Sequence, residues 1–234
     1  MLERDITVCC GRSHNFKPTS LRLISEIGAN SKILDIGGGD RKLDLPNYVN
    51  IDIIKYPSMT TILGDGHFLP FESNCFDIIL CEAVIEHCKK PWIVANELYR
   101  VLRKDGLIYI DAAFMQPVHS YPNHYFNMTL NGVETLFEKF EKIDSGVQTY
   151  QMPSFTLLFV LTNYIRCLFP FVDKYASNIQ IFDSGTFIKN RKKSSIFTRI
   201  YQLIQSILVV LDRRVPPEKA QGMAAGVYFI GRKG

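Results

Sequence analysis

An acid and three consecutive glycines come directly after an apolar run in ILDIGGGD, residues 33–40. Inside a regular element each glycine costs roughly 0.5–1 kcal/mol relative to alanine, so such a run indicates a tight turn or a ligand close to the backbone. The spacing D-x-G-G-G differs from the G-x-G-x-x-G of dinucleotide sites. Because Asp35 would repel a pyrophosphate, it favours a cationic ligand with hydrogen-bond donors and disfavours NAD.

Two further acids stand where a nucleoside would be bound. Asp52 ends a second apolar segment in NIDII, and its two carboxylate oxygens match the vicinal hydroxyls of a ribose. Asp65 lies in LGDGHFLPF, where it can contact an adenine edge with Phe68 and Leu69 as apolar cover. The alternative for Asp65 is a turn residue in a D-G pair.

Alternating strands and helices place these acids at one edge of a sheet. Short apolar runs predict strands, and longer segments with apolar residues at helical spacing predict helices. Strands are expected over 32–36, 48–54, about 59–65, 77–81, 107–111, 142–152 and 224–234. Helices are expected over 21–27, 92–101, 130–140, 155–172 and 196–211, and Thr19 or Ser20 is expected to cap the first of them. This order predicts an α/β fold with a doubly wound, mostly parallel sheet.

Five segments in this order resemble the class I methyltransferases that use S-adenosyl-L-methionine. They are DIGGGD, NID, GDGHFLPF, CFDIILCEAVIEH and LRKDGLIYI, over about residues 30–112. Arg41 departs from the pattern, because the family often has a further glycine there. The resemblance implies a Rossmann-like methyltransferase fold with seven strands. It also implies S-adenosyl-L-methionine as cofactor and S-adenosyl-L-homocysteine as product.

The resemblance also implies which residues contact the cofactor. The acid and glycines of the first turn would line the methionine end of the cofactor. Asp52 would bind the ribose, and Asp65 with Gly66 would contact the adenine. The end of the fourth strand would face the sulfonium. These residues are Asp35, Gly37, Gly38, Gly39, Asp52, Ile53, Asp65, Gly66, His67, Cys81, Glu82 and Ala83.

Histidines are the candidates for a catalytic base, because a hydroxyl acceptor needs a base with a pKa near neutrality. His119, His124 and Tyr125 follow the fifth expected strand in QPVHSYPNHYFNMT, a segment that resembles H-x-x-P-x-x-Y-F in methyltransferases of bacterial surface-sugar pathways. The alternative is that Tyr125 and Phe126 pack against the next helix and the histidines are solvated. His87, in EAVIEHC, is a further candidate for the base. The alternative is that it caps or braces a helix.

Composition argues against several other classes of protein. A net charge of +4 is too weak to indicate a nucleic-acid partner. The six cysteines form no C-x-x-C pair and no zinc-like spacing with the five histidines, so we expect no metal and a reduced, cytoplasmic setting. The first residues contain no apolar core of a signal peptide, and no apolar run is long enough to span a membrane.

Residues 151–222 interrupt the alternation with apolar helices, and we interpret them as an insertion before the last strand. The 196–211 segment is amphipathic and follows the basic stretch NRKKSS at 190–195. It favours either a lid or homodimer face, or an anionic membrane surface at the inner face of the membrane. The predicted units are an arm, a cofactor-binding core, the insertion and a final strand: 1–18, 19–150, 151–222 and 223–234.

Three functions are compatible with these patterns. The first is O-methylation of a sugar or a lipid-linked saccharide, since the apolar insertion next to the acceptor site suits a substrate with a lipid part. The second is methylation of a small apolar acceptor such as a quinone precursor or a fatty acid. The third is an inactive cofactor-binding module that holds a partner.

Overall fold

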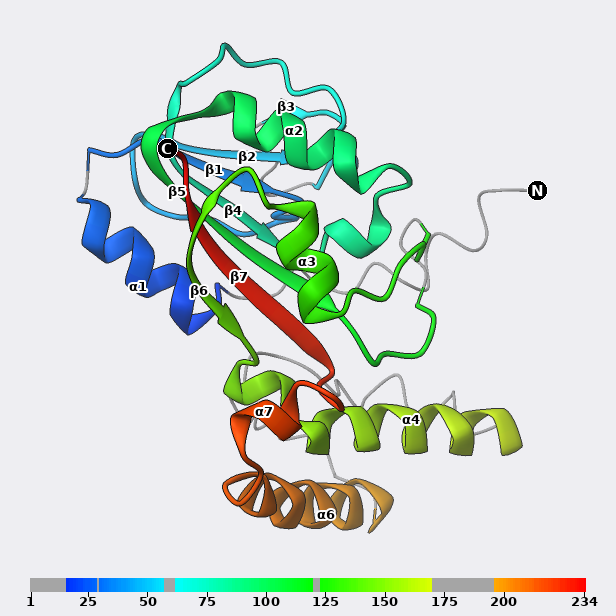
Figure 1. Ribbon diagram of the computed structural model, residues 1–234. Helices are drawn as coiled ribbons and strands as arrows, with labels where there is room; N and C mark the ends of the chain where they lie inside the picture. Colours follow the sequence, from blue (N-terminus) through cyan, green and yellow to red (C-terminus); the bar gives the residue numbers. More distant parts are fainter. Residues whose placement is uncertain (1–15, 29, 57–61, 120–122, 170–195) are drawn as a thin grey trace.

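A single seven-stranded sheet forms the centre of the molecule (Figure 1). The computed structural model describes residues 16–28, 30–56, 62–119, 123–169 and 196–234, and of 196–201 and 217 the backbone alone. The strands, in the sheet order β3-β2-β1-β4-β5-β7-β6, are β1 (Ile33–Ile36), β2 (Tyr48–Asp52), β3 (Ile62–Leu63), β4 (Phe76–Glu82), β5 (Leu102–Ala113), β6 (Glu141–Gly146) and β7 (Gly226–Arg232). Only β7 runs antiparallel to its neighbours in the described sheet, so the predicted doubly wound, mostly parallel fold is confirmed.

Helices cover both faces of this sheet. Alternate residues of β1 and β4 point to opposite faces, and each set joins a different apolar cluster. One face packs against α2 (Pro91–Val101) and α3 (Leu130–Leu136), and the other against α1 (Pro18–Ile27). Burial on both faces explains why the strands have continuous apolar runs.

Several element boundaries differ from the predictions. Helix α1 begins at Pro18 after Lys17, so Thr19 and Ser20 are buried inside the helix and neither is its N-cap. Proline is suited to the first helical position because its fixed φ matches the helix and its missing N–H has no partner there. Strand β5 begins at Leu102, which pairs with Phe76, and ends at Ala113, so it is longer than the predicted strand over 107–111.

The region after β5 also differs in detail. Helix α3 ends at Leu136, although a helix was predicted as far as residue 140. Strand β6 is confirmed but is shorter than predicted, because the chain leaves the sheet after Gly146 and forms a 3-10 turn, η2 (Thr149–Gln151). Gly146 has a φ of 156°, a value that glycine adopts readily.

A separate layer of helices lies beside the sheet, at the end where β7 begins (Figure 1). It contains α4 (Pro153–Leu168), α6 (Ile196–Asp212) and α7 (Pro217–Ala220). Because Gly226 at the start of β7 pairs with Ala113 at the end of β5, the layer lies at the carboxyl end of the parallel strands. No helix in the described part of the chain is long and apolar enough to cross a membrane.

Parts of three predicted segments and the whole of a fourth lie outside the described residues. They are most of the arm at 1–15, the start of the third strand at 59–61, and the end of the first insertion helix at 170–172 together with the basic stretch 190–195.

Candidate functional site

A pocket of about 240 Å³ opens at the carboxyl ends of β1, β2 and β4. In doubly wound sheets ligands bind at this edge, where the strand order reverses, and here the reversal falls between β1 and β4. The pocket is lined by Ile36, Gly37, Ile51, Asp52, Ile53, Gly64, Asp65, Gly66, His67, Val84, His87, Cys88, Lys89 and Tyr125. Predicted cofactor residues and predicted catalytic residues therefore border the same space.

The three glycines after β1 occupy different surroundings. Gly37 lines the pocket with a φ of 66°, and a Cβ there would meet Cγ2 of Val84 at 2.4 Å. A Cβ on Gly38 would meet Oδ2 of Asp35 at 2.4 Å. Gly39 lies beside the pocket and donates its amide to Oδ2 of Asp52 at 3.0 Å. The turn thus keeps the backbone close to the ligand space and close to two carboxylates.

Asp52 is held in a defined orientation at the pocket wall. Its Oδ2 accepts the Gly39 amide, and its Oδ1 accepts the Ile54 amide at 2.9 Å. Burial raises the pKa of Asp52, and these backbone hydrogen bonds oppose that rise. Both oxygens keep further lone pairs, so the carboxylate can accept from two vicinal hydroxyls. Ile53, half exposed beside it, adds an apolar surface.

The third acid forms a short hydrogen-bonded unit with His67. Oδ1 of Asp65 accepts the His67 amide at 2.9 Å and the His67 Nδ1 proton at 2.6 Å, and Nε2 of His67 accepts the Lys90 amide at 3.3 Å. Partial desolvation raises the pKa of Asp65, but the hydrogen bonds from His67 outweigh it and lower the pKa. With Gly66 beside it, this unit forms the outer wall of the pocket.

Arg41 forms a buried ion-pair network below the glycine turn. Its guanidinium contacts Oδ1 of Asp35 at 2.5 Å and Oε2 of Glu82 at 2.6 Å, and the three residues are at most 7% exposed. Tyr48 donates to Oδ2 of Asp35 at 2.7 Å, and the ring of Phe16 lies 4.7 Å from the guanidinium carbon. Burial raises the pKa of Asp35 to about 6, against the attraction of Arg41. In the sequence, the only signal for this network was Arg41 itself, which stands where the family often has a glycine.

Six predicted cofactor residues do not line the pocket, and Gly38 and Gly39 of the glycine turn are two of them. Asp35 and Glu82 point into the Arg41 network, and Cys81 is fully buried in the core, where desolvation raises the pKa of its thiol. Ala83 is half-buried with a φ of 56°, next to Val84 of the pocket wall. Their contacts with a cofactor stay predictions.

Three of the four predicted catalytic residues are histidines that the structure brings into contact. The ring centroids of His119 and His124 are 4.3 Å apart. The ring centroid of His87 lies 5.0 Å from that of His119 and 5.8 Å from that of His124. Nδ1 of His87 bonds to the Asn123 carbonyl at 2.8 Å. His87 comes from η1 (Ile85–His87), after β4, and the other two from the segment after β5. Tyr125, the fourth candidate, lines the pocket beside His87.

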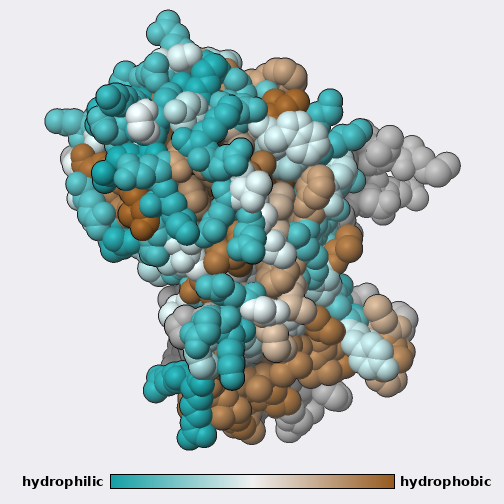
Figure 2. All heavy atoms as spheres, in the orientation of Figure 1, coloured by the Kyte–Doolittle hydropathy of each residue, from teal (hydrophilic) through white to brown (hydrophobic). Residues whose placement is uncertain are grey.

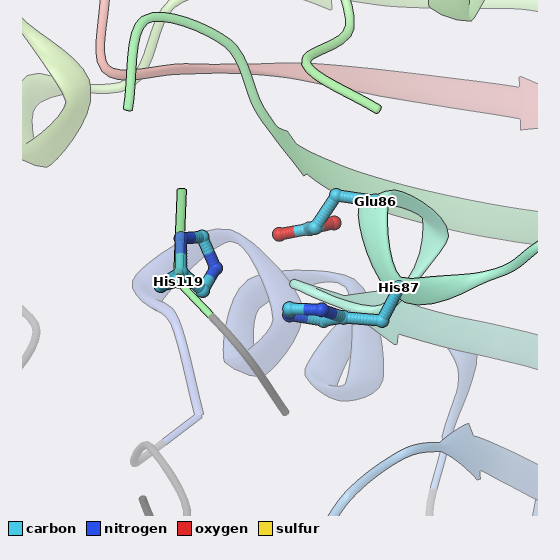
Figure 3. Close-up of side chains that lie close together, drawn as sticks. All are labelled: Glu86, His87 and His119. Atoms are coloured by element: carbon cyan, nitrogen blue, oxygen red, sulfur yellow. The ribbon is translucent and has the colours of Figure 1, made fainter. Parts of the chain in front are cut away.

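Glu86 lies at this cluster, although nothing in its sequence context singled it out. Its side chain is 1% exposed, and Oε2 has no hydrogen-bond partner among the described residues. Burial raises the pKa of Glu86 to about 8. In Figure 3 its carboxylate points toward His119 and lies above the ring of His87. Glu86, His87 and His119 each have one donor atom within 4.8 Å of those of the other two. Such a group could hold a metal ion, whereas the sequence patterns predicted none.

Comparisons with known proteins give the same reading of the first half of the chain. Residues 21–110 match the family model of a methyltransferase domain. An uncharacterized methyltransferase of Mycobacteroides abscessus is 39% identical over 54 residues, which are 23% of this chain and 21% of that protein. The matched region is thus about a fifth of the length of the curated relative.

Solved structures with low sequence identity share the fold. The [4+2]-cyclase SpnF has a TM-score of 0.53 at 13% identity, over 97% of this chain and 90% of its own. Phosphoethanolamine N-methyltransferase 2 of Haemonchus contortus, solved with S-adenosylhomocysteine, has a TM-score of 0.50 at 17% identity, over 92% of this chain and 52% of its own. These likenesses establish the Rossmann-like methyltransferase fold.

The residues at the pocket fit S-adenosyl-L-methionine, the cofactor of such domains. Gly37 brings the backbone to the pocket wall, Asp52 would present a fixed pair of acceptor oxygens to a ribose, and the Asp65–His67 unit would lie beside the adenine. A volume of about 240 Å³ is below the roughly 300–1,000 Å³ of pockets for drug-sized ligands, so part of the cofactor would extend beyond the pocket.

Proposed function

We propose that this chain is an S-adenosyl-L-methionine-dependent methyltransferase that methylates a hydroxyl of a sugar or lipid-linked saccharide. The observation that carries the proposal is the shared pocket, because His87 and Tyr125 line the same space as Asp52 and Asp65. Methyl transfer mainly requires that donor and acceptor be held in line. A pocket that joins a nucleoside site to a group of bases meets this requirement.

When bound, S-adenosyl-L-methionine supplies an activated methyl group on a sulfonium. Asp52 would accept from the ribose hydroxyls and so position that end of the cofactor. The hydrogen bond to Asn123 places a proton on Nδ1 of His87, which leaves Nε2 as the basic atom. Desolvation lowers the pKa of His87, so its ring is a neutral base near pH 7. His87 would take the acceptor proton, with His119 and His124 next to it.

The helical layer supports an acceptor with a lipid part. Figure 2 shows apolar atoms gathered over the region of α4 and α6, whereas the surface over the sheet is mostly hydrophilic. Exposed side chains of the layer include Val160 at 51% and Leu203 at 62%, and Arg213 and Arg214 are exposed at the end of α6. We propose that this layer contacts an anionic membrane surface from the cytoplasmic side. The resemblance of the histidine segment to surface-sugar methyltransferases agrees with this acceptor.

Two other functions use the same observations differently. The apolar layer also suits a small apolar acceptor, such as a quinone precursor or a fatty acid. The likeness to a [4+2]-cyclase shows that this fold also occurs in a protein with a different named activity. A further candidate is therefore an inactive module that binds the cofactor and holds a partner. A homodimer through α4 and α6 would cover the same apolar surface.

The test is transfer of label from methyl-labelled S-adenosyl-L-methionine to an extract of the native host. Lipid, polysaccharide, protein and small-molecule fractions are counted separately, and Asp52→Ala and Asp44→Ala serve as the variant with weakened cofactor binding and its surface control. Label in the lipid or polysaccharide fraction that Asp52→Ala lowers at a limiting cofactor concentration supports the proposal. Label among small apolar molecules supports the second function. Cofactor binding without label in any fraction supports the inactive module.

A further inference from the structure

We propose that Glu86, His87 and His119 bind a divalent transition metal ion at the edge of the cofactor pocket. Two imidazoles and one carboxylate are the protein ligands of many catalytic zinc and non-haem iron sites. Their donor atoms lie within 4.8 Å of one another. Bonds of about 2.0–2.2 Å at tetrahedral angles need separations of roughly 3.4 Å, so the donor atoms would move closer together on binding, and the exposed side chain of His119 has room to do so.

Glu86 is the observation that points to a ligand. Its side chain is 1% exposed, its Oε2 has no hydrogen-bond partner among the described residues, and Figure 3 shows the carboxylate directed to the two histidines. Burying a carboxylate oxygen without a partner is unfavourable. A cation between Glu86 and the histidines would supply the missing interaction.

Hydrogen bonds around the histidines orient them as metal ligands. Nδ1 of His87 bonds to the Asn123 carbonyl at 2.8 Å, and Nδ1 of His119 to the Pro117 carbonyl at 3.2 Å. Each bond places the proton on Nδ1 and the lone pair on Nε2, the pattern by which backbone carbonyls orient ligating histidines. His124 donates from Nε2 to the Phe126 carbonyl at 2.9 Å, and its Nδ1 lies 3.1 Å from Nδ1 of His119. We therefore assign His124 as a positioning residue for His119.

The site leaves at least one coordination position for another ligand. Three protein ligands are typical of catalytic zinc, whose fourth position takes water or substrate. His87 lines the pocket, so this position faces the acceptor space. If the proposed methyl transfer is correct, the ion would bind the acceptor hydroxyl and lower its pKa. With Nε2 of His87 bound to the ion, that atom would no longer serve as the base, and the proton would be released to solvent.

The test uses Co²⁺ as a spectroscopic probe on the full chain, without cofactor or acceptor. After dialysis against a chelator, the protein is titrated with CoCl₂ while visible absorption is recorded, and ZnCl₂ is added as competitor. We expect one equivalent bound and displaced by Zn²⁺. Glu86→Gln, His87→Ala and His119→Ala should each weaken binding at least tenfold.

The matched control is His67→Ala, which removes a histidine of the same pocket outside the cluster. Retained binding in this variant, with losses in the other three, supports the site. Unchanged affinity in Glu86→Gln and His87→Ala overturns it, as does the intense charge-transfer band of a cobalt thiolate, which would place the ion on a cysteine. Thermal unfolding of each variant separates loss of binding from loss of fold. Because no methyl transfer is measured, failure of the proposed activity leaves this result unaffected.

Discussion

The sheet and the helical layer differ in how completely they bury their apolar side chains. In the sheet, Ile33, Ile78 and Leu80 are fully buried between helices on both faces. In the layer, Leu203 and Ile207 of α6 are 62% and 53% exposed although the helix is as apolar as a core helix. The sheet is therefore complete as it stands, whereas the layer presents a surface that is suited to a further partner.

The two regions also use charge differently. Below the pocket, carboxylates are buried and paired, as in the contact of Arg41 with Asp35 and Glu82. In the layer, Asp212 is buried, and it accepts the Ser154 amide at 3.2 Å at the beginning of α4. The first arrangement constrains a binding site, and the second joins two helices whose outer surfaces stay apolar.

The largest expected effect tests whether the Arg41 network holds the sheet edge together. Arg41→Ala should lower the free energy of unfolding by about 3–5 kcal/mol, because it leaves two buried carboxylates without their cation. Urea unfolding at pH 7 measures the change. The control is Arg22→Ala, which removes an exposed i,i+4 ion pair worth about 0–1 kcal/mol. Equal effects of the two substitutions would contradict a structural role for the network.

A second prediction concerns Asp111, which accepts hydrogen bonds from Tyr150 and Gln151 between the sheet and η2. Burial raises its pKa to about 6 from 3.8, although Lys17 opposes the rise. Its contribution to stability is therefore fully present below about pH 3.8 and is lost as the pH rises through 6. Asp111→Asn should thus cost more at pH 4 than at pH 7, by up to about 3 kcal/mol.

Urea unfolding across this pH range measures the difference. Asp105→Asn, at an exposed turn of β5, is the control and should keep the wild-type profile. A constant cost of Asp111→Asn from pH 4 to pH 7 would show that the carboxyl group does not titrate in this range.

The pocket itself is tested by Asp52→Ala, which removes the oriented pair of acceptor oxygens. We expect affinity for S-adenosyl-L-homocysteine to fall by about 1–3 kcal/mol, or roughly 5- to 150-fold, in calorimetric titration. Asp44→Ala, an exposed acid after the same turn, should bind as the wild type does. If both variants bind equally well, Asp52 is not part of the cofactor site.

The smallest effect concerns the apolar surface of the layer. Leu203→Asp and Ile207→Asp should each weaken binding to anionic vesicles by about 1–2 kcal/mol, because each replaces an exposed apolar side chain with a negative charge. Co-sedimentation measures binding, and Gln202→Asp on the same helix adds the charge alone. Failure of the wild-type chain to co-sediment would favour a second copy or the acceptor as the partner of this surface.

Sequence reasoning was accurate where a feature depends on neighbouring residues. Apolar runs that end in acids located β1, β2 and the pocket positions of Asp52 and Asp65, since strand ends of a parallel sheet meet at one edge. It did not identify Glu86 or the role of Arg41, because their partners come from distant segments and both residues read as surface charges. The contact between His87 and His119 likewise depends on how the segment after β5 returns to the sheet.

The position of β7 has a consequence for how the sheet assembles. It lies between β5 and β6, and β6 pairs with β7 alone in the described sheet. Strand β6 ends at Gly146 and β7 begins at Gly226, with the helical layer between them in sequence. We expect β6 to join the sheet only after β7 has paired with β5. This pairing closes a long loop, and such a closure is entropically costly and slow. A chain in which β7 has not yet paired would expose β5 as an open strand edge, and unpaired edges of this kind promote aggregation.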